Sequence, residues 1–156
     1  MIATNAAVTK PDPRAARSVR RILLATDLSP ASDGATRQAI DLARDLGATL
    51  LVVSVIDPMA RGASGDHLSR MDQRRAAREA AAQDVVIQGR NAGVSVSFMV
   101  WEGEPGPSIV DAASSEQVDM VIVGSHGRGA VGRLLAGSVS EHVVRNAPCP
   151  VLVVRN

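Results

Sequence analysis

Aromatic side chains are nearly absent from this chain of 156 residues, which has one tryptophan, one phenylalanine and no tyrosine. The core must therefore be aliphatic, and the chain lacks the aromatic platforms on which single-stranded nucleic acids stack. Basic residues are not concentrated either. The nearest approach to a cluster is Arg74, Arg75 and Arg78, which we interpret as the solvated face of a helix. We therefore expect no nucleic-acid partner.

Cysteine and long apolar segments are equally scarce. The single cysteine, Cys149, excludes an internal disulfide and fits a reducing compartment. No apolar run approaches the roughly 18 residues of a membrane span, and residues 1–21 lack the apolar stretch of a secretory signal. One cysteine and three scattered histidines provide no metal-ligand spacing. We expect a soluble cytoplasmic protein without a membrane partner or a metal site of its own.

Strand-like apolar runs alternate with helix-like segments along most of the chain. Residues 1–19 contain two prolines among small and polar residues and are predicted to form a mobile tail, whereas residues 20–156 predict one domain. The predicted strands are 22–26, 49–56, 94–101, 119–123 and 151–154. The predicted helices are 30–46, 67–91, 107–116 and 138–144. Continuous apolar strands alternating with helices are typical of an α/β protein with a parallel sheet covered on both faces.

The most informative segment is a glycine-rich loop after the fourth predicted strand. Gly124-Ser125-His126-Gly127 is followed after nine residues by Gly137-Ser138, where the last predicted helix begins. Glycines let backbone N–H groups approach a ligand without a Cβ between them, and a helix N-terminus favours anions. The order of strand, glycine-rich loop and helix therefore predicts a phosphate site.

Two well-known phosphate loops do not fit this segment. A P-loop requires Lys and then Ser or Thr after its last glycine, whereas Gly132 is followed by Arg133-Leu134. The spacing G-x-G-x-x-G does occur at residues 127–132, but it follows a late strand, and residues 150–154 supply no acid for a ribose. A connection without a ligand remains the alternative on these residues alone.

The arrangement resembles the universal stress protein family, specifically its ATP-binding branch, whose hallmark is G-x2-G-x9-G-[S/T]. Gly124, Gly127, Gly137 and Ser138 fill that pattern. The resemblance covers about residues 20–155 and includes three other segments, 22–29, 51–57 and 146–154. It implies a doubly wound sheet of five parallel strands in the order 3-2-1-4-5, with helices on both faces. Strands one and four would then meet at the switch point, where such sheets bind ligands.

The resemblance also implies that an adenine nucleotide, ATP with Mg²⁺, binds in that crevice. Four of the expected contacts have an ordinary alternative: Asp27 as a cap of the following helix, Val55 as a core residue, Ser138 as an N-cap and Arg128 as a solvated loop arginine. The expected binding residues are Thr26, Asp27, Val55, Gly124, His126, Gly127, Arg128, Gly137, Ser138 and Val139.

The loop offers hydrogen-bond donors but no evident base, so we expect a regulatory nucleotide-binding protein with no catalytic residue and at most slow hydrolysis. The alternative is a family member that acts through protein contacts without ATP. A phosphoacceptor domain fits poorly because its site needs a lysine and the only lysine is Lys10, in the predicted tail. A flavin-binding electron carrier also fits poorly, because only Trp101 is available to flank the flavin. Val151–Val154 is a predicted edge strand, and the resemblance implies a homodimer paired through it.

Overall fold

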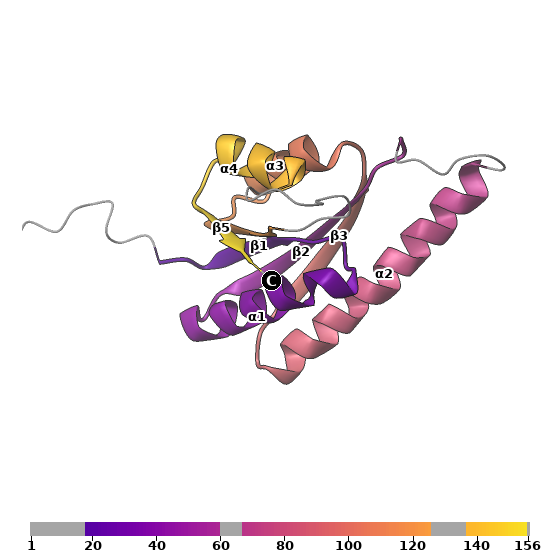
Figure 1. Cartoon of the computed structure of the whole chain (residues 1–156). Helices are drawn as coiled ribbons and strands as arrows, with labels where there is room; N and C mark the ends of the chain where they lie inside the picture. Colours follow the sequence, from indigo (N-terminus) through magenta and orange to yellow (C-terminus); the bar gives the residue numbers. More distant parts are fainter. Residues whose placement is uncertain (1–17, 60–66, 126–136, 156) are drawn as a thin grey trace, which may run out of the picture.

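Five aliphatic segments form one sheet in which every pair of neighbouring strands is parallel, in the order β3-β2-β1-β4-β5 (Figure 1). The computed structural model describes residues 18–59, 67–125 and 137–155. The strands are β1 (Arg21–Ala25), β2 (Thr49–Ile56), β3 (Val96–Glu102), β4 (Met120–Gly124) and β5 (Val151–Val154). The strand order expected from the family resemblance is therefore confirmed.

A helix connects each strand to the next, as parallel pairing requires. A 3₁₀ turn, η1 (Pro30–Ser32), leads into α1 (Asp33–Leu46), which precedes β2. The other helices are α2 (His67–Asn91), α3 (Pro105–Ser115) and α4 (Ser138–Asn146). Figure 1 shows α1 and α2 on one side of the sheet and α3 and α4 on the other. The prediction of helices on both faces is thus confirmed.

The three central strands, β1, β2 and β4, are mostly buried on both faces, which explains why their sequences are almost entirely apolar. Successive residues of a strand point to opposite faces, so alternate side chains of β1, β2 and β4 enter two separate cores. The core beneath α1 and α2 contains Ile22, Leu24, Leu50, Val52 and Ile122. The core beneath α3 and α4 contains Leu23, Leu51, Val53, Val121 and Val123.

Two helix starts differ from the sequence prediction. The segment after Ser29 forms a short 3₁₀ turn before α1, and the Ser29 side chain does not cap it because its hydroxyl donates to Asp27 instead. Helix α3 begins at Pro105 rather than at Pro107. Both prolines fit its first turn, where backbone N–H groups have no intrahelical partner.

An aspartate ties β1 to β4 at the amino ends of the strands. Asp119 immediately precedes β4 instead of beginning it. Its Oδ2 accepts hydrogen bonds from the backbone N–H groups of Arg20 at 2.9 Å and Arg21 at 3.0 Å. The register of β1 against β4, with Ala25 beside Val123, is therefore supported from the end opposite to the expected site.

Candidate functional site

The carboxyl ends of β1 and β4 lie side by side at the centre of the sheet. Ala25 pairs with Val53 on one side and with Val123 on the other. The chain leaves β1 through α1 toward β2, whereas β4 continues through α4 toward β5. The order of the strands thus reverses between β1 and β4. Sheets of this kind bind ligands beyond the carboxyl ends of the strands at such a reversal, and we call this place the crevice.

The loop after β1 is closed on itself by side-chain hydrogen bonds. Thr26 Oγ1 accepts from the N–H of Leu28 at 2.9 Å and donates to Ser32 Oγ at 2.9 Å. Asp27 Oδ1 accepts from the N–H of Ser29 at 3.0 Å and from its hydroxyl at 2.6 Å. The carboxylate thereby holds a tight turn in which Leu28 has a φ of +56°. The alternative role expected for Asp27 was a cap on the following helix, but its bonds reach Ser29, the residue before η1, and not α1.

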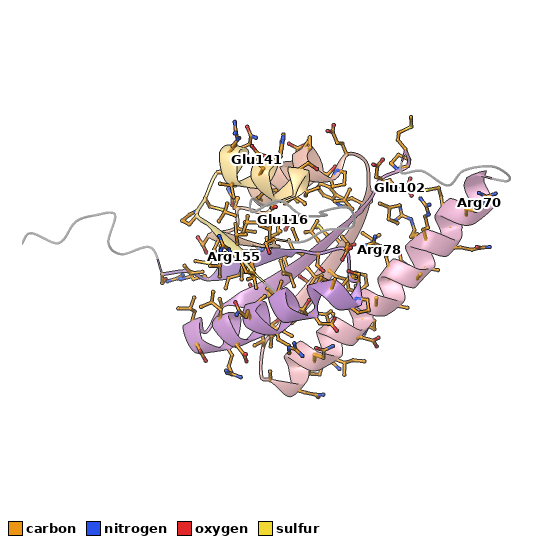
Figure 2. The ribbon with its side chains drawn as sticks, in the orientation of Figure 1. Arg70, Arg78, Glu102, Glu116, Glu141 and Arg155 are labelled. Atoms are coloured by element: carbon orange, nitrogen blue, oxygen red, sulfur yellow. The ribbon has the colours of Figure 1, made fainter. Side chains whose placement is uncertain are left out.

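Arg78 is a part of this rim that the sequence interpretation missed. Figure 2 shows it reaching from α2 toward the end of β1. Its guanidinium donates to the backbone carbonyl of Asp27 and, at 2.8 Å, to Ser54 Oγ. Ser54 is only 1% exposed. A lone serine inside the apolar run 49–56 was the available signal, because a buried hydroxyl needs a polar partner.

The neighbouring Arg75 also binds the sheet. It donates to the carbonyl of Val100 at 3.2 Å and to Glu102 at 2.6 Å. The hydrogen bond with Glu102 raises the pKa of Arg75 above its usual value. The expectation of a merely solvated arginine face was therefore wrong for Arg75 and Arg78, because both side chains bridge α2 to strand ends.

Val55 lies at the carboxyl end of β2, on the face that carries α3 and α4. It is half-buried and packs against the core on that side. Its partner in the register of β3 is Trp101, which is also half-buried and packs against the same core. The core alternative for Val55 is observed, and its partial exposure leaves room for a ligand contact.

The two ends of the glycine motif meet beside β4. The backbone N–H of Gly137 donates to the carbonyl of Ser125 over 3.4 Å, and Ser125 in turn donates to Val154 at 2.7 Å. Gly124 ends β4, and Gly137 is the N-cap of α4. The first turn of α4 is therefore held at the carboxyl edge of the sheet.

Ser138 and Val139 are the first two residues of α4 rather than its cap, so the N-cap alternative for Ser138 was wrong. Ser138 is exposed, whereas Val139 is half-buried against the core. Their N–H groups belong to the first turn, where intrahelical acceptors are lacking. His126, Gly127 and Arg128, the remaining predicted contacts, lie outside the described residues.

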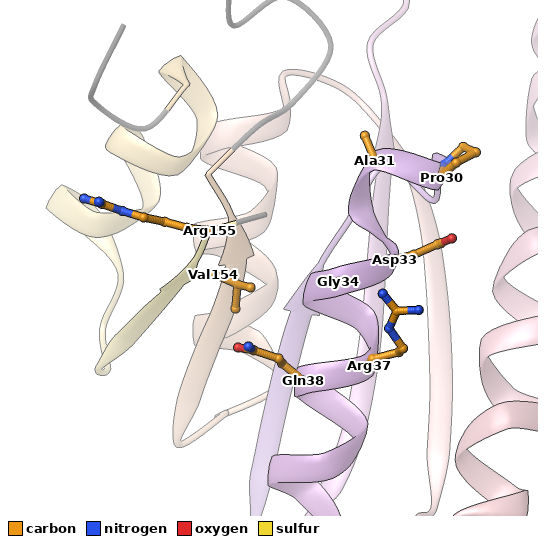
Figure 3. A pocket seen from close by; sticks show the side chains of 8 residues that line it. All are labelled: Pro30, Ala31, Asp33, Gly34, Arg37, Gln38, Val154 and Arg155. Atoms are coloured by element: carbon orange, nitrogen blue, oxygen red, sulfur yellow. The ribbon is translucent and has the colours of Figure 1, made fainter.

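A hollow of about 690 Å³ lies elsewhere, between the start of α1 and the end of β5. Figure 3 shows Val154 and Gln38 bordering it, while Arg155 points away from α1. Its charged groups do not converge on a common point, so it resembles a surface depression more than a binding site. The crevice at β1 and β4 is the better candidate.

A cluster of metal-ligating side chains and a membrane-spanning helix are both absent from residues 18–59, 67–125 and 137–155. No group of three or more His, Cys, Asp or Glu side chains in these ranges is arranged to hold a metal ion. No helix in the same ranges combines the length and apolar character needed to cross a membrane.

The fold and the crevice define a doubly wound α/β protein with a helix N-terminus at its switch point. The profile of the universal stress protein family matches residues 18–155, and the chain therefore belongs to that family.

Curated relatives and solved structures agree with this assignment. A universal stress protein of Thermus aquaticus is 35% identical over 138 residues, covering 87% of this chain and 98% of the relative. One of Methanocaldococcus jannaschii is 30% identical over 139 residues, covering 87% and 82%. The structure of the universal stress protein UspA from Lactobacillus plantarum aligns with a TM-score of 0.80 at 25% identity, covering 88% of this chain and 98% of that one.

Proposed function

We propose that this protein binds an adenine nucleotide, ATP with Mg²⁺, in the crevice between β1 and β4, and that occupancy regulates its conformation or partners. The observation that carries the proposal is the bond between Gly137 and Ser125, which holds the start of α4 beside the ends of β1 and β4. A helix N-terminus at a switch point offers N–H donors and a positive dipole end to phosphates.

Three structural neighbours support the choice of an adenine nucleotide. Solved structures of universal stress proteins hold cAMP in one case, dAMP in a protein from Archaeoglobus fulgidus, and AMP in a protein from Arabidopsis thaliana. Their identities to this chain are 21%, 21% and 19%, so by themselves they establish a shared fold. The motif residues Gly124, Gly127, Gly137 and Ser138 extend the comparison to the site.

The proposed roles follow from the chemistry of each residue. The N–H groups of Ser138 and Val139, with the Ser138 hydroxyl, donate to a phosphate. Asp27 accepts hydrogen bonds from the ribose or the adenine amino group, and Val55 supplies an apolar contact. Gly127, His126 and Arg128 are assigned to the phosphates through the family pattern. Mg²⁺ would bind phosphate oxygens and water, as it usually does in nucleotide sites.

Slow or absent hydrolysis is part of the proposal. Two titratable side chains stand one turn into α4, and both have other roles. Glu141 is exposed and pairs with Arg145 at 2.7 Å. The His142 ring packs against Gly106 so closely that a Cβ there would lie 2.9 Å from it. Neither is placed as a base for an attacking water, which ATP hydrolysis requires.

We also propose that the protein is a cytoplasmic homodimer paired through β5. This strand is at the edge of the sheet, and its Leu152 side chain is 39% exposed. A strand at the edge of a sheet can pair with a second copy of the chain. The other edge strand, β3, differs because Arg75 binds its Val100 carbonyl. Sedimentation at tens of micromolar should give the mass of a dimer, and a monomer would contradict this part.

The binding proposal is tested by calorimetric titration of nucleotide-stripped protein with ATP and Mg²⁺, beside UTP and inorganic tripolyphosphate. We expect ATP to bind in the micromolar range and to remain intact over the titration. Turnover on the order of 1 per second would contradict a regulatory binding role. Absence of ATP binding would instead favour a family member that works through protein contacts alone.

A further inference from the structure

The only tryptophan of the chain lies at the carboxyl edge of the sheet, two strands from β1. Trp101 is the neighbour of Val55 in the register of β2 and β3. Both side chains pack against the core beneath α3 and α4, and both remain partly exposed. An indole and a valine therefore share an apolar surface on the same face of the sheet as the start of α4.

The distance across the strands suits an extended nucleotide. Neighbouring strands are about 4.8 Å apart, so the end of β3 is roughly 14 Å from the end of β4. The anion-binding end of the crevice is at β4 and α4, where Ser138 is exposed. A nucleotide whose phosphates lie there, and whose ribose lies near Asp27, directs its base toward β2 and β3.

We infer that Trp101 forms the wall of the base site and sets a preference for purines over pyrimidines. The inference rests on the proposed function and specifies which base that site accepts. The larger π-face of a purine covers more of an indole, and aromatic side chains stabilise bases by stacking with little hydrogen-bond selectivity. The Trp101 site therefore favours ATP over UTP and discriminates weakly between ATP and GTP.

A fluorescence experiment tests the inference directly, because the chain has one tryptophan and no tyrosine, so that its intrinsic emission comes from Trp101. The emission and its quenching by acrylamide are measured with and without ATP and Mg²⁺, with inorganic tripolyphosphate as the probe that lacks a base. We expect ATP to alter the emission and to protect Trp101 from acrylamide. Tripolyphosphate should bind without either effect.

Matched variants separate stacking from folding. Trp101→Leu should lower ATP affinity roughly tenfold and leave tripolyphosphate affinity unchanged, while Trp101→Phe should retain most of the ATP affinity. The control is Phe98→Leu, because Phe98 is on the same strand but packs against the opposite core, beneath α1 and α2. It should bind ATP like the native protein.

The outcomes distinguish this inference from the proposal beneath it. ATP binding with unchanged emission and quenching, or with native affinity in Trp101→Leu, would overturn the role of Trp101 and leave nucleotide binding intact. Equal affinities for ATP and UTP would overturn the purine preference. Failure of the native protein to bind ATP in calorimetry would overturn the proposed function and this inference with it.

Discussion

The two rims of the crevice are built in opposite ways. The β1 rim is a turn held by side chains, in which Thr26 and Asp27 bond to neighbouring residues and Arg78 binds the Asp27 carbonyl. The β4 rim ends in the first turn of α4, where the exposed Ser138 adjoins N–H groups that lack intrahelical acceptors. Side chains therefore shape the β1 rim, whereas the backbone supplies the donors of the β4 rim.

The largest expected effect comes from a substitution at the β4 rim, which supplies the backbone donors. Ser138→Pro removes both the N–H and the hydroxyl, yet proline suits the first position of a helix, and the preceding Gly137 has the extended ψ of 162° that proline favours. We expect ATP affinity to fall on the order of a hundredfold, because two charge-assisted hydrogen bonds are lost. Calorimetry measures the change.

The control for that variant is Ser138→Ala, which removes only the hydroxyl and should cost about tenfold in affinity. The thermal midpoint of both variants should stay close to that of the native protein. Native ATP affinity in Ser138→Pro would contradict the assignment of α4 as the phosphate donor.

The next largest effect comes from a substitution at the β1 rim, which side chains hold in shape. Arg78→Leu removes the bonds to the Asp27 carbonyl and to Ser54 Oγ, and we expect the free energy of unfolding to fall by about 2–3 kcal/mol. ATP affinity should fall only a few-fold, since no direct contact is lost. Denaturant titration and calorimetry give the two quantities.

Adding Ser54→Ala to Arg78→Leu should restore part of the lost stability, because the unsatisfied buried hydroxyl is then removed. Strictly additive losses in the double variant would show that Arg78 and Ser54 do not act as a pair.

A smaller effect is expected at the opposite end of the sheet. Asp119→Ala removes the acceptor of the Arg20 and Arg21 N–H groups, and we expect it to lower the free energy of unfolding by about 1–2 kcal/mol. ATP affinity should not change, because Asp119 is at the amino ends of the strands. An affinity loss comparable to that of Ser138→Ala would indicate that general loosening accounts for both.

The smallest expected effect concerns Cys149, which precedes β5 at the same amino end. Burial, together with the nearby charge of Asp119, raises the pKa of this thiol above its ordinary value. Iodoacetamide should therefore modify native protein more slowly than unfolded protein near neutral pH, and the rate should rise with pH as the thiolate forms. ATP should leave the rate unchanged.

The same shift has a defined sign for stability. Because the folded pKa is raised, the contribution of the neutral thiol is fully present below its ordinary pKa and is lost as pH rises through the raised value. If iodoacetamide modified native protein as fast as unfolded protein at neutral pH, the raised pKa of Cys149 would be contradicted.

Much of the fold follows from local patterns in the sequence. Strand β2 and helix α2 have the predicted bounds, 49–56 and 67–91, because a run rich in β-branched residues and a long alanine-rich segment each favour one structure. Gly47 ends α1 with a φ of +63°, which glycine adopts without strain. The start of α3 was misplaced because two prolines, Pro105 and Pro107, suit the same turn.

The candidate site was only partly predictable. The positions of Asp27, Gly124 and Gly137 at strand and helix ends follow from the alternation of elements. The contact of Arg78 with Asp27 does not, since it joins residues 51 positions apart and depends on how α2 crosses the sheet. The pairing of Val55 with Trp101 likewise depends on the register of β2 and β3, which separate segments do not specify.

The central claim is the location of the nucleotide, and backbone amide mapping by NMR during titration with ATP and Mg²⁺ tests it most directly. We expect the largest shifts at Thr26, Asp27, Ser138 and Val139, with the amides of Arg20 and Arg21 unaffected. Saturable shifts centred on the hollow between α1 and β5, or an absence of shifts at both rims, would contradict it.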